Sequence, residues 1–108
     1  MIKLSCTTHA HLRARQRNGW SRTTTARMLE RVFYAGVDAI DCKGELRRYL
    51  TALPYDTVHQ CVRIYGEQVY LFARNEPDEA ALVTVYHLPL SYRHAAHRAL
   101  RSQHALAA

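Results

Sequence analysis

The fold is decided by the stretch at residues 58–74, which reads VHQCVRIYGEQVYLFAR. Apolar and polar residues alternate from Val58 to Tyr65, and this period of two is typical of a strand with one buried face. The pair Gly66-Glu67 predicts a tight hairpin turn, because glycine adopts the backbone angles that such turns require. Residues Gln68 to Arg74 then return as a second strand. The stretch therefore predicts an antiparallel hairpin.

Further strands are predicted on both sides of this hairpin. After a polar loop at residues 75–79, Ala80 to Leu88 form another strand, which extends the hairpin into a meander. On the N-terminal side, residues 37–44 form a connection. Glu45 to Leu50 fit either a short edge strand or a last helical turn, and we interpret them as the strand. Together these segments predict a four-stranded antiparallel sheet.

Two helices are predicted before the sheet. Thr7 or Thr8 can cap the first, which ends at Asn18-Gly19 because glycine commonly closes a helix in the left-handed conformation. Ser21 can cap the second helix, and Gly36 ends it. The apolar residues of this second helix recur at the spacing of one buried stripe. They are Ala26, Met28, Leu29, Val32 and Phe33.

A last helix is predicted at residues 91–108, after Pro89 ends the meander. The element order is then α-α-β-β-β-β-α. The predicted fold class is α+β, with two N-terminal helices packed on a four-stranded antiparallel meander, plus a C-terminal helix. We expect the helices on one sheet face, because a short antiparallel sheet can bury one side and leave the other in water. A chain of 108 residues has the size of one domain, 1–108.

The positive charge of the chain is concentrated at its two ends. The net charge is +6. Residues 1–35 carry seven Lys/Arg and one acidic residue, residues 36–90 carry five against eight, and residues 91–108 carry three against none. This arrangement favours a polyanionic partner, most simply RNA or another nucleic acid. The alternative is a basic, solvated surface without a partner.

Other composition features point to a cytoplasmic location. The longest apolar run is far shorter than the roughly 20 residues of a membrane span, so no membrane association is expected. The first residues, MIKLSC, lack the apolar region of a secretory signal. Cys6, Cys42 and Cys61 are odd in number and far apart, which indicates neither a disulfide framework nor a zinc site. We expect neither a metal nor another cofactor.

One motif in the first predicted helix contains the residues best suited to catalysis or to phosphate binding. His9, Arg13 and Arg17 stand at positions i, i+4 and i+8, so they share one helix face. Imidazole can move protons near neutral pH, and guanidinium neutralises phosphate charge. The face therefore suits phosphate chemistry, and it suits plain phosphate binding equally well.

The same residues belong to a wider pattern. His9-Ala10-x-x-Arg13-x-x-x-Arg17, Trp20-Ser21, residues 63–66 (RIYG) and residues 82–86 (LVTVY) resemble the barnase/EndoU/RelE-like superfamily of small toxins. The closest likeness is to compact domains whose first helix begins His-Ala-x-x-Arg. The resemblance covers residues 8–88 as the core, and the basic C-terminal helix at 91–108 lies outside it.

The resemblance implies two N-terminal helices on a four-stranded antiparallel sheet. It also implies, for many members, cleavage or binding of RNA without a metal ion. Whether an antitoxin or another protein is a further partner stays open at this point. The sequence departs from the family pattern at Asn18, which separates Arg17 from Gly19 where arginine and glycine often adjoin. This insertion bears on the orientation of Arg17.

The sharpest hypothesis is a toxin-like, metal-independent ribonuclease. His9 would be the general base on a ribose 2′-hydroxyl, Arg13 would stabilise the pentavalent phosphate, and Thr84 or Tyr86 would position the phosphate or the leaving oxygen. The expected RNA-binding residues are Arg17, Arg27, Arg63 and Tyr65. Convergence on one cleft requires Arg63 and Tyr65 to share the sheet face of Thr84 and Tyr86.

Two alternatives remain at this point. In the first, the protein is a non-catalytic module from a phage, plasmid or bacterial host that kept the toxin-like fold to bind RNA or a protein. In the second, His9 caps the helix or forms a hydrogen bond near its start, and Arg13 forms a structural ion pair. Thr84 and Tyr86 then belong to an ordinary solvent-facing sheet surface.

Overall fold

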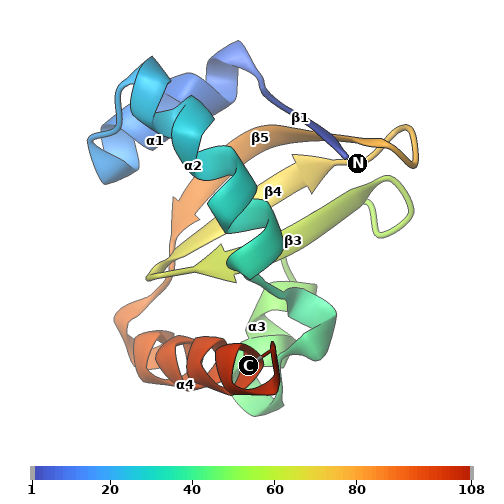
Figure 1. Ribbon diagram of the computed structural model, residues 1–108. Helices are drawn as coiled ribbons and strands as arrows, with labels where there is room; N and C mark the ends of the chain where they lie inside the picture. Colours follow the sequence, from blue (N-terminus) through green and yellow to red (C-terminus); the bar gives the residue numbers. More distant parts are fainter. Residues whose placement is uncertain (1, 108) are drawn as a thin grey trace.

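A five-stranded mixed sheet forms the centre of the molecule, and helices lie on both sides of it (Figure 1). The computed structural model describes residues 2–107, with side chains for residues 2–105. The elements in chain order are β1 (Lys3–Cys6), α1 (Thr8–Asn18), α2 (Arg22–Ala35), β2 (Val37–Asp38), the 3-10 helix η1 (Ala39–Asp41), α3 (Gly44–Thr51), β3 (Gln60–Tyr65), β4 (Gln68–Ala73), β5 (Glu79–His87) and α4 (Leu90–Ala107).

The predicted meander is present as β3, β4 and β5, which pair antiparallel in that order. The hairpin turn falls at Gly66-Glu67 as predicted, with Tyr65 opposite Gln68 and Gly66 at a φ of 60°. β3 begins at Gln60, two residues later than expected, because the carboxylate of Asp56 accepts from the backbone N–H of Val58 and holds the preceding loop in a turn.

Two strands of the sheet were not predicted. β1 pairs parallel with the first half of β5, from Lys3 opposite Glu79 to Cys6 opposite Leu82, and occupies one edge. The two-residue β2 pairs antiparallel with β3 at the other edge. The strand order is β1-β5-β4-β3-β2, so the expected four-stranded antiparallel sheet is corrected to a five-stranded mixed one. A parallel edge strand has no local turn signal, because its partner lies more than 70 residues further along the chain.

The interpretation of Glu45 to Leu50 as an edge strand was wrong, because this segment lies in the helix α3. Leu46 and Leu50 are four residues apart, on one helix face, and are 2% and 0% exposed. Glu45 and Arg48 form an exposed i,i+3 ion pair at 2.9 Å on the outer side. Burial of the two leucines is the main stabilisation of so short a helix, since exposed ion pairs contribute little.

The ends of α1 and α2 lie where the sequence predicts them. The side chain of Thr7 accepts from the backbone N–H of Ala10 at 3.0 Å, and Gly19 closes α1 at a φ of 70°. The side chain of Ser21 accepts from the N–H of Thr24 at 3.1 Å. Gly36 ends α2 for a different reason than a left-handed turn. Its φ is −69°, and a Cβ there would collide with the carbonyl oxygens of Val32 in α2 and Ile64 in β3.

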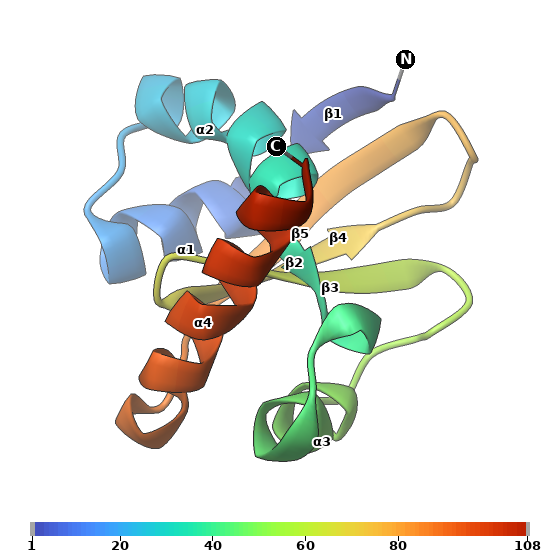
Figure 2. The same cartoon turned by 60° about the horizontal axis from the view of Figure 1, so that its bottom comes forward.

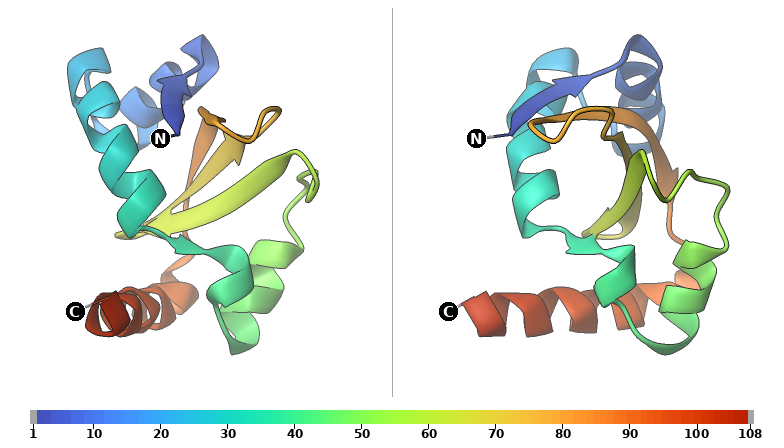
Figure 3. Two further views of the ribbon diagram at one scale, coloured as in Figure 1. Left: turned by 45° about the vertical axis from the view of Figure 1, so that its right-hand side comes forward. Right: turned by 90° about the vertical axis from the view of Figure 1, so that its right-hand side faces the viewer.

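The helices cover both sheet faces, which corrects the expectation of a single covered face (Figure 3). Tyr70 and Phe72 of β4 pack with α1 and α2, while Val69 and Leu71 of the same strand pack with α3 and α4. β4 is therefore buried on both sides, as a central strand between two helical layers must be. Figure 2 shows α4 running in front of the sheet toward the end of α2. No helix within residues 2–107 combines the length and apolar character needed to cross a bilayer.

Candidate functional site

The first helix lies beside the half of β5 that β1 leaves unpaired. The backbone N–H of Thr7 donates to the carbonyl of Leu82 at 3.0 Å, and the Thr7 hydroxyl lies 3.4 Å from the carbonyl of Val83. The buried residues of α1 are Ala10 and Ala14, both 0% exposed. Because these side chains are small, the helix approaches the sheet closely and its long polar side chains stand at the rim of the contact.

A row of polar side chains follows one face of α1. Arg13 Nε lies 3.4 Å from His9 Nε2, and Arg13 Nη1 donates to Gln16 Oε1 at 2.8 Å. The guanidinium is therefore held between two side chains, one helical turn on either side of it. In this contact Arg13 Nε–H donates and His9 Nε2 accepts. His9 and Gln16 are exposed, and Arg13 is half-buried.

The end of the same row reaches β5. The guanidinium carbon of Arg17 lies 6.0 Å from the centroid of the Tyr86 ring, at the outer limit of a cation–π contact. Arg17 Nε is buried and meets no acceptor within the described residues. The structure thus brings His9, Arg13 and Arg17 onto one helix face, as predicted, and places Tyr86 at its C-terminal end.

Asn18 has a structural role that accounts for its position between Arg17 and Gly19. Asn18 Nδ2 donates to Tyr70 Oη at 3.1 Å and ties the end of α1 to the central strand β4. Tyr70 is fully buried and stacks on Trp20 at a centroid distance of 6.2 Å. Burial raises the pKa of Tyr70 to about 12, so its hydroxyl stays neutral while its oxygen accepts from Asn18.

A bulge in β5 determines how the predicted β5 residues lie. Leu71 pairs with Thr84 and Phe72 with Leu82, so one extra residue, Val83, stands in β5. Thr84 is 7% exposed. Tyr86 is half-buried and packs against the cluster formed with α3 and α4. Of the two side chains named from the sequence, Tyr86 is therefore the one that solvent and Arg17 both reach.

Three of the predicted RNA-binding residues lie elsewhere. Arg63 Nη1 donates to the carbonyl of Phe33 at 3.0 Å, and its Nε lies 3.3 Å from Asp38 Oδ2 in an ion pair that is not aligned as a hydrogen bond. Tyr65 packs on the α1/α2 side of the sheet, opposite to Tyr86. Arg27 is exposed on α2. The structure does not bring these side chains together with Tyr86.

A shallow groove of about 730 Å³ borders His9 on the other side of α1. It runs between α1 and the start of α2, and it contains no acidic residue. Its lining residues are Thr8, His9, His11, Leu12, Arg15, Gly19, Trp20, Ser21 and Arg22. The sequence signal for it was the short Gly19-Trp20-Ser21 link, which forces two arginine-bearing helices together. The groove was not predicted, because its lining depends on how the two helices cross.

His11 differs from His9 in its surroundings. Its Nδ1 is buried and has no hydrogen-bond partner within the described chain. Burial, with a smaller contribution from the nearby Arg22 guanidinium, lowers the pKa of His11 below its ordinary value. His11 therefore favours the neutral form, whereas His9 stands exposed at the junction of the polar row and the groove.

Comparison with protein-family models, with curated proteins and with solved structures finds no match to this chain. Among residues 2–107, no three His, Cys, Asp or Glu side chains gather in a group that could hold a metal ion.

Proposed function

We propose that the protein is a RelE/barnase-like toxin, an endoribonuclease that cleaves RNA by metal-independent general acid/base catalysis. The observation that carries this proposal is the row on α1, in which an exposed, proton-accepting His9 Nε2 lies 3.4 Å from the half-buried Arg13 guanidinium. A base and a fixed cation side by side are what the attack of a ribose hydroxyl on the adjacent phosphate requires.

In the proposed reaction the substrate phosphate takes the Arg13 Nε–H away from His9. The freed His9 Nε2 then accepts the proton of the 2′-hydroxyl, and the 2′-oxygen attacks the adjacent phosphorus. The bond from phosphorus to the 5′-oxygen breaks, and the leaving oxygen takes a proton from the Tyr86 hydroxyl. The products are a 2′,3′-cyclic phosphate and a free 5′-hydroxyl on the leaving strand, and the proton on His9 returns to Tyr86 through water. Arg13 stabilises the charge of the pentavalent phosphate. Arg17, whose guanidinium lies beside Tyr86 at the end of the same row, supplies a further positive charge near the phosphate.

Tyr86 is the proposed partner of the leaving oxygen, because it is half-buried beside Arg17. Thr84 is less suited to contact RNA, because it is 7% exposed, and its proposed role is to support the β5 surface from within. Arg63 and Tyr65 are assigned to the fold rather than to RNA binding, since Arg63 is engaged by Phe33 and Asp38.

A non-catalytic RNA-binding module is the second candidate. The contact that favours it is the hydrogen bond from Arg13 to Gln16 at 2.8 Å, which occupies part of the guanidinium that catalysis would need. In this candidate the toxin-like fold, the polar row and the basic groove bind RNA or a protein partner without cleaving it.

The deciding experiment measures cleavage of end-labelled RNA in EDTA by the wild type and by His9→Gln. The matched control is His59→Gln, because His59 is an exposed histidine far from α1 in the chain. We expect cyclic-phosphate products from the wild type and the control, and a loss of about 10²–10⁴-fold in rate for His9→Gln. Equal cleavage by all three proteins would overturn the role of His9. Salt-sensitive RNA binding without any cleavage would establish the binding module instead.

A companion experiment expresses the same three proteins in a bacterial host. Growth arrest by the wild type and His59→Gln, but not by His9→Gln, is the result expected of a toxin. Harmless expression of well-folded wild type at high level would contradict the toxin assignment.

A further inference from the structure

The C-terminal helix α4 is basic along its whole length. Its sequence, LSYRHAAHRALRSQHALA, contains three arginines and three histidines and no acidic residue. These residues lie outside the row on α1 and outside the groove beside it. The proposed cleavage reaction uses none of them.

The apolar side of α4 is already occupied by the protein core. Ala96 is 0% exposed, and the neighbouring apolar side chains pack against the cluster shared with α3. Tyr92 stacks on Tyr49 at a centroid distance of 4.8 Å. Gln103 Nε2 donates to the carbonyls of Ala35 and Gly36, at 3.2 and 2.9 Å. Since this side is covered, α4 cannot lay an apolar face into a lipid bilayer as an interfacial helix does.

The polar side of α4 remains free beyond its first turns. Arg93 and His97 are near Glu67, at 3.6 and 4.0 Å respectively. By contrast, Arg98 and Arg101 are exposed and form no ion pair within the described residues. His94, Arg98 and Arg101 follow one another at i, i+4 and i+7, which is one stripe of a helix.

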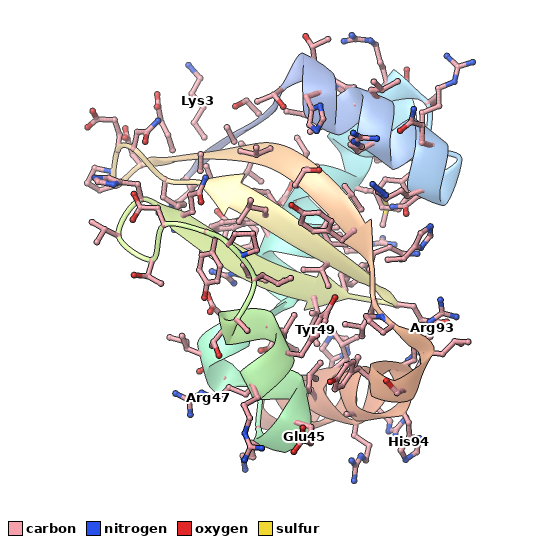
Figure 4. All side chains as sticks on the ribbon, turned by 180° about the vertical axis from the view of Figure 1, so that it is seen from behind. Lys3, Glu45, Arg47, Tyr49, Arg93 and His94 are labelled. Carbon is pink, nitrogen blue, oxygen red and sulfur yellow. The ribbon has the colours of Figure 1, made fainter. Side chains whose placement is uncertain are left out.

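The stripe begins next to the end of β5 that carries Tyr86. Arg93 Nε donates to the carbonyl of Leu88 at 3.3 Å and holds the joint between β5 and α4. Figure 4 shows Arg93 on the side of α4 that faces the sheet and His94 on the side that faces away from the sheet and from α1. An RNA strand leaving the α1 site therefore has to pass around the start of α4 to reach the stripe. A stripe from His94 to Arg101 is about 10 Å long, which spans several charges of a nucleic-acid backbone.

We propose that α4 is a second phosphate-binding surface, made by His94, Arg98 and Arg101, which contacts the backbone of an RNA strand held at the α1 site. This inference rests on RNA as the ligand of the proposed function. The surface recognises charge rather than sequence, because its charge comes from Arg98 and Arg101, which are exposed and form no ion pair within the described residues. Its expected effect is to favour RNA long enough to leave the α1 site and pass over α4.

The test measures binding of fluorescent single-stranded RNA of two lengths, about 5 and about 20 nucleotides, by anisotropy across a salt series. All riboses carry 2′-O-methyl groups, so the attacking hydroxyl is absent and no cleavage intervenes. The variant is Arg98→Gln/Arg101→Gln. The control is Lys3→Gln/Arg31→Gln, which removes the same charge from exposed residues of β1 and α2, outside both α1 and α4.

We expect the α4 variant to bind the long RNA about 10-fold more weakly near 0.1 M salt, with a salt slope shallower by about 1 to 1.5. The short RNA should lose less than about 2-fold. Equal losses for the variant and the control, or equal losses for both RNA lengths, would overturn the proposal. Thermal unfolding of each variant establishes that the substitutions leave the fold intact.

Two further measurements distinguish this inference from the proposed function and from binding to a membrane. Cleavage of the short unmodified RNA by the wild type depends on α1 alone, so cleavage without a length effect defeats the inference and leaves the proposed function standing. If binding depends on RNA length but no RNA is cleaved, the proposed ribonuclease function fails and the inference about α4 stands. Binding of vesicles with anionic lipids that is lost in the α4 variant, while long-RNA binding is not, would assign the surface to a membrane and overturn the RNA proposal.

Discussion

The helices α1 and α4 carry the same sign of charge but hold it in different ways. On α1, Arg13 is fixed between His9 and Gln16, and Arg17 lies over Tyr86. On α4, Arg98 and Arg101 are exposed and without ion pairs in the described structure. A cation held by neighbouring side chains can stabilise one particular geometry of a phosphate. A cation without such contacts attracts the phosphate but does not select its geometry. We therefore expect α1 to govern the rate of a reaction and α4 to govern affinity.

The two helices also differ in how they are attached. α1 is 11 residues long and buries two alanines, so contacts at its ends, from Thr7 and Asn18, determine its position. α4 is 18 residues long and is held by an apolar stripe that packs on the core. A short helix with a small buried face is sensitive to each of its contacts, because few others compensate for a loss.

The substitution expected to distinguish the two helices most strongly is Arg13→Ala. Removing a positioned cation should lower the single-turnover cleavage rate by about 10²–10³-fold, as the loss of one charge-stabilising donor does elsewhere. Arg98→Ala should act on apparent affinity instead. Arg31→Ala, an exposed arginine on α2, is the control and should leave both quantities unchanged. If Arg13→Ala and Arg98→Ala alter the same kinetic parameter, the distinction between the helices fails.

Ala14→Leu tests how closely α1 packs on the sheet. Ala14 is 0% exposed, so three added carbon atoms should lower the free energy of unfolding by about 2–3 kcal/mol. Urea denaturation followed by circular dichroism measures this change. Ala26 of α2 is exposed, although the sequence pattern placed it in the buried stripe of that helix, and the same substitution there is the control. A cost below about 0.5 kcal/mol at Ala14 would mean that α1 is loosely attached.

Asn18→Ala removes the contact that anchors the end of α1. The buried hydroxyl of Tyr70 loses its partner, and the expected cost is about 1–2 kcal/mol in unfolding free energy. Adding Tyr70→Phe should restore part of the loss, because the orphaned hydroxyl is then gone. If the double variant is no more stable than Asn18→Ala, the hydrogen bond does not anchor the helix.

The Arg17–Tyr86 contact is expected to contribute less. A double-mutant cycle with Arg17→Met and Tyr86→Leu should give a coupling energy of about 0.5 kcal/mol, the lower end for an exposed cation–π pair. Tyr86→Phe keeps the ring and should retain the coupling. Additive effects of the two changes would show that Arg17 is as free as the arginines of α4.

The smallest expected effect concerns His11. Its pKa is lowered in the folded state, by burial and then by Arg22, so the unfolded chain binds a proton first as the pH falls. Stability should therefore be full above the ordinary histidine pKa of about 6.5 and decline as the pH falls through that value. His11→Gln should flatten this part of the stability profile between pH 7 and 5.5. An unchanged profile would place His11 in water.

Local signals predicted much of the fold correctly, for reasons that lie in particular residues. Thr7, Gly19 and Ser21 act within their own turns, so the ends of α1 and α2 followed from the sequence. Gly66 did the same for the β3–β4 hairpin. β1 and α3 were missed, because a parallel edge strand and a two-turn helix are defined by partners far along the chain.

In the candidate site, too, the features that depend on local sequence were predicted and those that depend on distant contacts were not. The spacing of His9, Arg13 and Arg17 was enough to place them on one helix face, since helix geometry is local. The separation of Arg63 and Tyr65 from Tyr86 was not foreseeable, because it depends on which helices cover each face of the sheet.

By itself, the sequence determined the α+β class, the helix boundaries of α1 and α2, the β-meander and the cationic row on α1, because each of these depends on residues close together in the chain. Tertiary structure alone decided that β1 forms a parallel edge strand beside β5. It also decided that Thr84 is buried next to the β5 bulge and that Asn18 anchors α1 to Tyr70. It also decided that α4 turns its apolar side inward and leaves its cations in water. The physical reason is that burial is shared between segments far apart in the chain, so no single segment specifies which of its faces will be covered.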